Sequence, residues 1–176
     1  MPGRVTIGLY NSYDPVKFHE SHRRALARAG PLALAFDCNL ATFGFPYDKE
    51  LGTPAEIADW ISTTTSIGES GGYLVELASK GRFSAFDFPK KGFPPQLGEV
   101  IVTTRKPDES KKATPAQVRS VVASGRSVLL VFGLGPRGLP SEIFGMSSKH
   151  LDITGRGMSL ETCTALGAVV ALLKGR

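Results

Sequence analysis

Short apolar runs alternate with helix-start signals along most of this 176-residue chain. Strand-length runs lie at residues 5–9, 100–104 and 127–132, and Thr-Pro pairs at residues 53–54 and 114–115 mark helix starts. A capping threonine followed by proline at the first helical position is a typical helix beginning. This alternation predicts an α/β fold with a mostly parallel sheet flanked by helices.

The predicted boundaries come from the apolar runs and the glycine, proline and capping residues beside them. We expect strands at residues 5–9, 32–36, 83–88, 100–104, 127–132 and 150–153, and helices at residues 18–29, 54–61, 73–80, 115–124 and 158–173. Gly30-Pro31 ends the first helix in this interpretation, residues 37–52 form a loop and residues 68–72 are flexible. No linker divides the chain, so residues 1–176 are predicted to form a single domain.

The composition bears on the cellular location of the protein and on metal binding. No run approaches the ~18 apolar residues of a membrane span, and no signal-like apolar segment precedes residue 5. We therefore expect a cytoplasmic protein without membrane partners. Cys38 and Cys163 lie far apart and have no CxxC partner, so we expect two buried reduced thiols and no metal.

The net charge of +5 favours polyanion partners. The cations cluster in three patches, each of which is alternatively a solvated surface. They are His22-Arg23-Arg24 with Arg28, Arg105-Lys106 with Lys111-Lys112, and Lys90-Lys91.

Three loops, each following an apolar strand, carry the ligand-binding signal. They begin at Thr103-Thr104, at residues 133–138 and at residues 154–159. Loops at the carboxyl ends of parallel strands form the ligand crevice, and glycines let backbone approach a ligand closely. Residues 133–138 spell neither GxGxxG nor a phosphate-binding loop, so an ordinary strand-to-helix turn is the alternative.

Two C-terminal segments resemble motifs of the SPOUT superfamily of S-adenosylmethionine-dependent RNA methyltransferases. VLLVFGLGPRGLP is similar to a strand that ends in a Phe-Gly-x-x-x-x-Gly-Leu loop. LDITGRGMSLETCTALGAVVALL is similar to a short strand, a glycine-containing loop and a Ser-Leu-x-x-x-x-Ala helix start. The order and separation match, and the resemblance is to a minimal, archaeal-type branch.

This resemblance implies a deep C-terminal trefoil knot over about residues 99–176, S-adenosylmethionine as cofactor, a homodimer, and tRNA or rRNA as substrate. The cofactor-binding residues that it implies are Thr103, Thr104, Phe132, Gly133, Leu134, Gly135, Gly138, Leu139, Leu151, Ile153, Thr154, Met158, Ser159 and Leu160.

Two catalytic candidates come from the same resemblance. DPVKFHESHRRALARAG is similar to an N-terminal motif of the ribose-methylating branch, which places a substrate-side role on Arg23; an exposed helix arginine is the alternative. Glu161 stands where that branch has Asn, and Gly135 where it has Glu, so base versus ribose methylation stays open. Glu161 contacts a base edge or the sulfonium in this hypothesis, or is a helix-terminal carboxylate.

Other polar and aromatic side chains receive structural interpretations. His19 and His22 share a helix face and are interpreted as surface residues rather than proton carriers. The aromatic residues are assigned mostly to the core rather than to base stacking: Phe43, Phe45, Trp60, Phe83, Phe86 and Phe88.

The sequence therefore predicts a homodimeric RNA methyltransferase that uses S-adenosylmethionine. One alternative is a catalytically inactive SPOUT-fold protein that binds RNA or S-adenosylmethionine. Another is a nucleotide-binding hydrolase on an ordinary doubly wound sheet, which requires a phosphate loop or a carboxylate pair that the sequence does not show.

Overall fold

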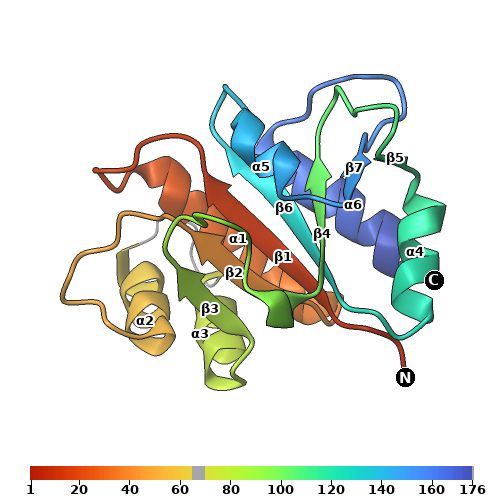
Figure 1. Cartoon of the computed structure of the whole chain (residues 1–176). Helices are drawn as coiled ribbons and strands as arrows, with labels where there is room; N and C mark the ends of the chain where they lie inside the picture. The colour runs from red at the N-terminus through yellow and green to blue at the C-terminus, as the bar shows by residue number, and fades with distance from the viewer. Residues whose placement is uncertain (65–69, 176) are drawn as a thin grey trace.

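The computed structural model describes residues 1–64 and 70–175 and contains one seven-stranded sheet in the order β3-β2-β1-β6-β4-β7-β5 (Figure 1). All neighbouring strands are parallel. The strands are β1 (Val5–Asn11), β2 (Asn39–Phe43), β3 (Phe83–Phe86), β4 (Glu99–Thr103), β5 (Lys112–Ala113), β6 (Val128–Leu134) and β7 (Lys149–Leu151). The helices are α1 (Glu20–Ala35), α2 (Pro54–Thr64), α3 (Ser70–Ser79), α4 (Pro115–Ala123), α5 (Ser141–Gly145) and α6 (Thr162–Lys174), with a 3-10 helix at Pro95–Leu97.

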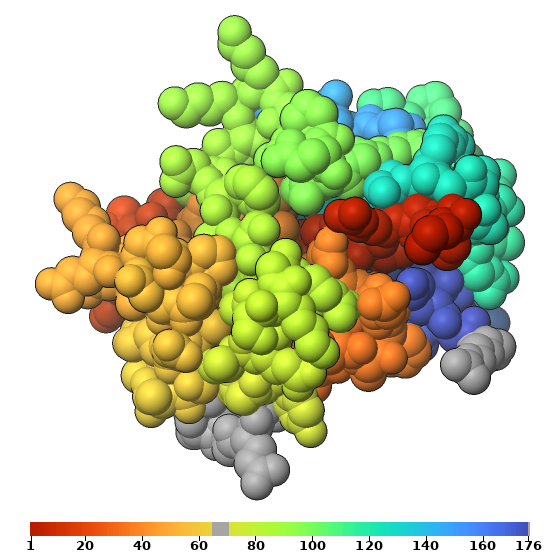
Figure 2. Space-filling view, turned by 90° about the horizontal axis from the view of Figure 1, so that it is seen from below, coloured from red at the N-terminus to blue at the C-terminus, as the bar shows by residue number. Residues whose placement is uncertain are grey.

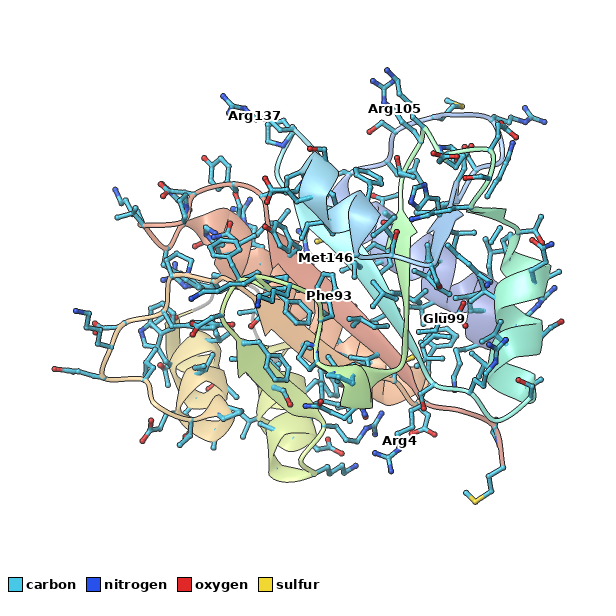
Figure 3. The ribbon with its side chains drawn as sticks, in the orientation of Figure 1. Arg4, Phe93, Glu99, Arg105, Arg137 and Met146 are labelled. Atoms are coloured by element: carbon cyan, nitrogen blue, oxygen red, sulfur yellow. The ribbon has the colours of Figure 1, made fainter. Side chains whose placement is uncertain are left out.

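The two faces of the sheet are covered unequally. Helices α1, α2, α3, α4 and α6 contribute apolar residues to the larger core, which includes Ile7, Leu130 and Phe132 from the sheet. On the other face, a smaller core forms under α5 and the segment that carries Phe93. Figure 3 shows Phe93 and Met146 in front of the sheet. The predicted fold class, a parallel sheet flanked by helices, is confirmed.

Helix α1 is longer than predicted, since it begins at Glu20 and continues through Gly30 and Pro31 to Ala35. Gly30 permits close packing rather than termination, because a Cβ there would lie 3.0 Å from the backbone nitrogen of Leu74 in α3. The apolar residues 32–36, predicted as a strand, belong almost entirely to this helix.

The stop signal of α1 is Asp37, which adopts a left-handed φ of 53°. Its N–H donates to the Leu34 carbonyl (3.3 Å), and the N–H of Cys38 donates to the Ala33 carbonyl (2.8 Å). This pair of hydrogen bonds is a Schellman motif, in which a left-handed residue closes the helix. Strand β2 follows at once, in place of the predicted loop over residues 37–52.

The other predicted strands and helices agree with the structure to different degrees. Strands β1, β3, β4, β6 and β7 and helices α2, α3 and α4 are confirmed with shifted ends, whereas β5 and α5 were missed. Helix α6 begins at Thr162 rather than near residue 158. The predicted flexibility of residues 68–72 lies outside the described residues at positions 68 and 69, and Ser70 begins α3.

The N-terminal residues lie beside the end of α4 and the amino end of β6. Figure 2, seen from below, shows this red segment against the teal segment that leads into β6. The N–H of Gly3 donates to the carbonyl of Val122 (2.8 Å), and the N–H of Val128 donates to that of Arg4 (2.9 Å). The carboxyl ends of the strands lie at the opposite edge, where the predicted ligand loops are.

Candidate functional site

The carboxyl ends of β6, β4 and β7 lie side by side, because these strands are consecutive in the sheet. The three loops selected from the sequence follow these ends, at the upper edge of the sheet in Figure 1. They surround a cavity of about 1130 Å³. Ligands of open parallel sheets bind at this edge, so the cavity is the candidate ligand site.

Most residues that the resemblance assigned to the cofactor line this cavity. They are Thr103, Thr104, Phe132, Gly133, Leu134, Gly135, Gly138, Leu139, Ile153, Met158, Ser159 and Leu160. Leu151 and Thr154 are not on the cavity wall. The wall also contains residues that the sequence analysis did not select, among them Tyr13, Asp108, Arg137, Phe144, His150 and Asp152.

The glycine-rich loop after β6 begins later than predicted, because the strand runs on to Leu134. A Cβ on Gly133 would lie only 3.1 Å from the carbonyl carbon of Gly138 and from the Oγ of Ser12. The loop therefore folds back closely over the strand end. Gly135, with a φ of 129°, supplies a backbone conformation that side chains disfavour, and the Oγ of Ser12 donates to the Leu134 carbonyl (3.0 Å).

The loop after β7 is shaped by Asp152 and Thr154. The Oδ2 of Asp152 accepts from the N–H of Gly157 (2.8 Å), and its Oδ1 accepts from the N–H and the hydroxyl of Thr154, both at 3.2 Å. The Oγ1 of Thr154 in turn accepts from the N–H of Met158 (3.3 Å). Thr154 thus organises the loop instead of facing the cavity, whereas Leu151, 1% exposed, packs in the larger core.

Glu161 lines the cavity and also caps α6. Its Oε2 accepts from the backbone N–H groups of Cys163 (2.9 Å) and Thr164 (3.2 Å). The hydroxyl of Thr162 donates to the carbonyl of Gly133 (3.0 Å), which ties the start of α6 to the end of β6. The alternative interpretation of Glu161 as a helix-terminal carboxylate is confirmed, and its catalytic role stays a prediction.

Arg23 is not among the residues that line the cavity. Its Nη1 lies 2.8 Å from the Oε2 of Glu20, and its guanidinium lies over the rings of Trp60 (5.0 Å) and Phe18 (5.6 Å). The alternative of an exposed arginine is wrong, since the side chain is only 20% exposed. Its substrate-side role stays a prediction.

His19 and His22 belong to a hydrogen-bond network between β1 and α1. The buried Nε2 of His22 lies 3.0 Å from the Oδ1 of Asn11, and its Nδ1 accepts from the N–H of His19 (2.9 Å). The Nε2 of His19 lies 2.8 Å from the Oδ2 of Asp14. Burial, reinforced by the neighbouring His19, lowers the pKa of His22 to about 4. The hydrogen bond from His19 lowers the pKa of Asp14. The prediction that both histidines are surface residues is wrong for His22.

The aromatic and sulfur-containing side chains outside the cavity are largely structural. Phe43, Phe45 and Phe83 are buried as predicted, whereas Trp60, Phe86 and Phe88 are half-buried. Cys38 and Cys163 are free thiols; Cys38 is buried and Cys163 half-buried, and burial raises the pKa of Cys38 to about 11. Within residues 1–64 and 70–175, no three acidic, histidine or cysteine side chains gather as potential metal ligands.

In the described part of the chain, no helix has the length and apolar character needed to cross a membrane.

A family model described as "Protein of unknown function (DUF531)" matches residues 5–174. The "Uncharacterized protein MJ0224" of Methanocaldococcus jannaschii is 43% identical over 170 residues, which cover 97% of this chain and 93% of the relative. The chain therefore belongs to this DUF531 family.

Solved structures with the same architecture are methyltransferases by their descriptions. A probable methyltransferase from Bordetella pertussis aligns over 98% of this chain and 95% of its own length, with a TM-score of 0.65 and 15% identity. A structure described by "the 2-OH methylation of C/U34 on tRNA" aligns over 98% and 90%, with a TM-score of 0.59 and 16% identity. The SpoU methyltransferase AviRb of Streptomyces viridochromogenes, in complex with the cofactor AdoMet, has a TM-score of 0.52 and 13% identity. The chain covers only 57% of AviRb's length and aligns over 98% of its own. These similarities show that the chain has the fold of SpoU-type, or SPOUT, methyltransferases.

Proposed function

We propose that this protein is an S-adenosylmethionine-dependent RNA methyltransferase. The observation that carries the proposal is the cavity at the carboxyl ends of β4, β6 and β7, built from the three loops that the SPOUT resemblance marks. The proposal includes a single domain with the knot at residues 99–176 and a homodimer.

The residues of the cavity fit the proposed cofactor. Phe132, Leu139, Ile153 and Leu160 offer apolar walls for an adenine ring, and the loops supply backbone donors and acceptors. A side chain at Gly133 would press against Gly138 and Ser12, so glycine suits this close approach of the loop. The volume of about 1130 Å³ is slightly above the usual upper end of roughly 1,000 Å³ for ligand pockets, so the cavity is large enough for the cofactor.

S-adenosylmethionine supplies an electrophilic methyl group on a sulfonium, and the protein has to position the acceptor in line with it. Three tethers fix the cavity wall and so support this positioning. Asp152 holds the loop after β7, Thr162 holds the start of α6, and Ser12 holds the loop after β6. Glu161 places a carboxylate at the cavity whose orientation is set by the helix cap. Preorganised groups of this kind are what transfer chemistry requires.

Cations at the rim of the cavity support an RNA substrate. Arg105, Lys106 and Arg137 line the cavity and are exposed, and no ion pair engages them among the described residues. Figure 3 shows Arg105 and Arg137 pointing away from the sheet at its upper edge. Contacts to phosphates supply most of the affinity of nucleic-acid binding proteins.

The alternative of a catalytically inactive SPOUT-fold protein is favoured by one observation. The only carboxylate proposed for catalysis, Glu161, already accepts two backbone hydrogen bonds at the start of α6. Arg23, the other candidate, lies outside the cavity of a single chain, so a second protomer or a rearrangement has to bring it there.

Transfer of labelled methyl groups from S-adenosylmethionine to bulk tRNA and rRNA tests the proposal. We expect label in one RNA fraction, lost in Ser159→Trp, whose ring fills the cavity from an exposed loop position. Gly92→Trp is the matched control, because Gly92 is exposed in a loop outside the cavity and has open space around it. Cofactor binding without transfer to either fraction would favour the inactive alternative.

A further inference from the structure

His150 in β7 is buried, with an exposed fraction of 4%. The backbone N–H of Asp108 donates to its Nδ1 at 3.0 Å. A nitrogen that accepts a hydrogen bond carries no proton, so the proton of the neutral ring must be on Nε2. The backbone thus fixes His150 as a single hydrogen-bond donor.

That donor has no partner. The Nε2 of His150 is inaccessible to solvent and makes no hydrogen bond within the described residues. Buried polar groups in native proteins are almost always paired, so an unpaired one requires an explanation. His150 lines the cavity, so a ligand that displaces the atoms now covering its Nε2 can become the missing partner.

The surroundings of His150 define the chemistry of that partner. The ring of Phe144 meets the imidazole edge-on, with centroids 5.3 Å apart and planes at 75°. Leu139 is a further apolar residue on the wall of the same cavity. The nearby cation of Lys111 is occupied, because its Nζ donates to the carbonyls of Phe144 (3.4 Å) and Ser147 (2.9 Å).

A neutral donor beside apolar walls suits an uncharged planar acceptor better than a phosphate or carboxylate, which attract charged donors. We propose that the Nε2–H of His150 donates to a ring nitrogen or carbonyl oxygen of a nucleobase held in this cavity. The inference rests on the proposed function, which supplies two such nucleobases: the adenine of the cofactor and the target base of the RNA.

Nuclear magnetic resonance of protein labelled with ¹⁵N in its histidine rings tests this contact directly. The chain has three histidines, so His150→Gln and His19→Gln assign the signals. We expect the free protein to show His150 protonated on Nε2 only. If S-adenosylhomocysteine alone moves the Nε2 proton downfield and slows its exchange, adenine is the acceptor. If the change requires added bulk tRNA, the target base is the acceptor.

Affinity measurements provide the second readout. His150→Phe keeps the ring shape and removes the donor, and we expect about a tenfold loss of affinity for the nucleobase ligand, the usual effect of one hydrogen bond. His150→Gln keeps a donor and should recover most of it. His19→Gln, outside the cavity, should bind as the wild type does. Each of the 1-, 3- and 7-deaza analogues of S-adenosylhomocysteine lacks one ring nitrogen of adenine. If adenine is the acceptor, the analogue that lacks the accepting nitrogen should bind the wild type weakly. The same analogue should bind His150→Phe with no further loss of affinity.

The outcomes separate this inference from the proposed function. A wild-type protein that fails to bind S-adenosylhomocysteine contradicts both. Saturable binding of S-adenosylhomocysteine and tRNA, with an unmoved Nε2 proton and equal affinities in His150→Phe, overturns the role of His150 and leaves the proposed function intact.

Discussion

Two buried histidines at the same edge of the sheet differ in one respect. His22 and His150 are 0% and 4% exposed, and each accepts a backbone hydrogen bond on Nδ1. The Nε2 of His22 is paired with Asn11, whereas that of His150 has no partner in the described structure. We call the paired groups around Asn11 and His22, which connect β1 to α1, the closed network. We call the cavity wall that contains the unpaired His150 the open region.

Polar groups around Asn11 and His22 contribute to stability, whereas the unpaired donor of His150 is available for a ligand. In the closed network, Asn11 bonds to Asp14, Gly44, Tyr13 and His22. Around the cavity, hydrogen bonds such as that from the N–H of Gly157 to Asp152 shape the loops. The Nε2–H of His150 has no partner among the described residues. Substitutions should therefore lower stability at the first region and ligand affinity at the second.

Asn11→Leu should have the largest effect on stability. It removes four hydrogen bonds around a side chain that is 3% exposed, so we expect the free energy of unfolding to fall by about 3 kcal/mol. Urea denaturation measures this loss. Asn39→Leu is the control, because Asn39 accepts one long side-chain bond from Arg82 (3.4 Å) and should cost under about 1 kcal/mol. Equal losses of unfolding free energy in Asn11→Leu and Asn39→Leu would contradict a larger stabilising role for the closed network.

Acidification should weaken the closed network through His22. The pKa of His22 is lowered from 6.5 to about 4 in the folded protein. Between these pH values the unfolded chain therefore binds a proton at His22 and the native chain does not. The free energy of unfolding should then fall by on the order of 2 kcal/mol as the pH drops from 7 to 4.5. The lowered pKa of Asp14 adds its loss only below about pH 4. Denaturation curves at several pH values should show a weaker dependence in His22→Phe; an unchanged dependence would count against this assignment.

The same substitution, His→Phe, can be made at both buried histidines, so His150→Phe and His22→Phe can be compared directly. Each substitution leaves one backbone N–H unpaired, but only His22→Phe also breaks a second bond, to Asn11. His150→Phe instead removes an unpaired donor. We expect a loss of about 2 kcal/mol for His22→Phe and under about 1 kcal/mol for His150→Phe in urea denaturation. The reverse order would contradict the distinction between the two regions.

Arg137→Ala should have the smallest effect, confined to RNA binding. Arg137 is exposed at the cavity rim, so its loss should leave stability unchanged and reduce the slope of log affinity against log salt concentration by about 1. Filter binding of bulk tRNA at several salt concentrations measures this slope. Lys80→Ala, which lies just after the end of α3 and is paired with Glu76, should leave this slope unchanged. Identical slopes in both variants would remove Arg137 from the RNA surface.

The fold was more predictable from the sequence in its C-terminal half. Strands β4 and β6 and helix α4 carry unambiguous apolar runs and a Thr-Pro cap. In the N-terminal half, Gly30-Pro31 carries the usual signal of a helix end, but close packing on α3 keeps the helix going. The true stop, Asp37 in a left-handed conformation, has no reliable sequence signal because aspartate is common in every kind of turn.

The glycines of the loops allow the position of the cavity to be predicted from the sequence. The polar side chains on its wall, such as His150, cannot be predicted in this way. Gly133 lies near the end of β6 and Gly135 directly after it, in a recognisable pattern of glycines at the end of an apolar run. His150 gave no signal, because its tautomer is set by the backbone N–H of Asp108, which lies 42 residues away in the chain and binds Nδ1. The same holds for the pairing of Asn11 with His22 across 11 residues. Such pairings are set by tertiary packing.

Calorimetric titration with S-adenosylmethionine and S-adenosylhomocysteine determines whether the cavity at the carboxyl ends of β4, β6 and β7 is a cofactor site. We predict saturable binding to the wild type and to Gly92→Trp, and none to Ser159→Trp, whose side chain would occupy the cavity. Absence of binding to the wild type, or equal binding to all three proteins, would contradict the account.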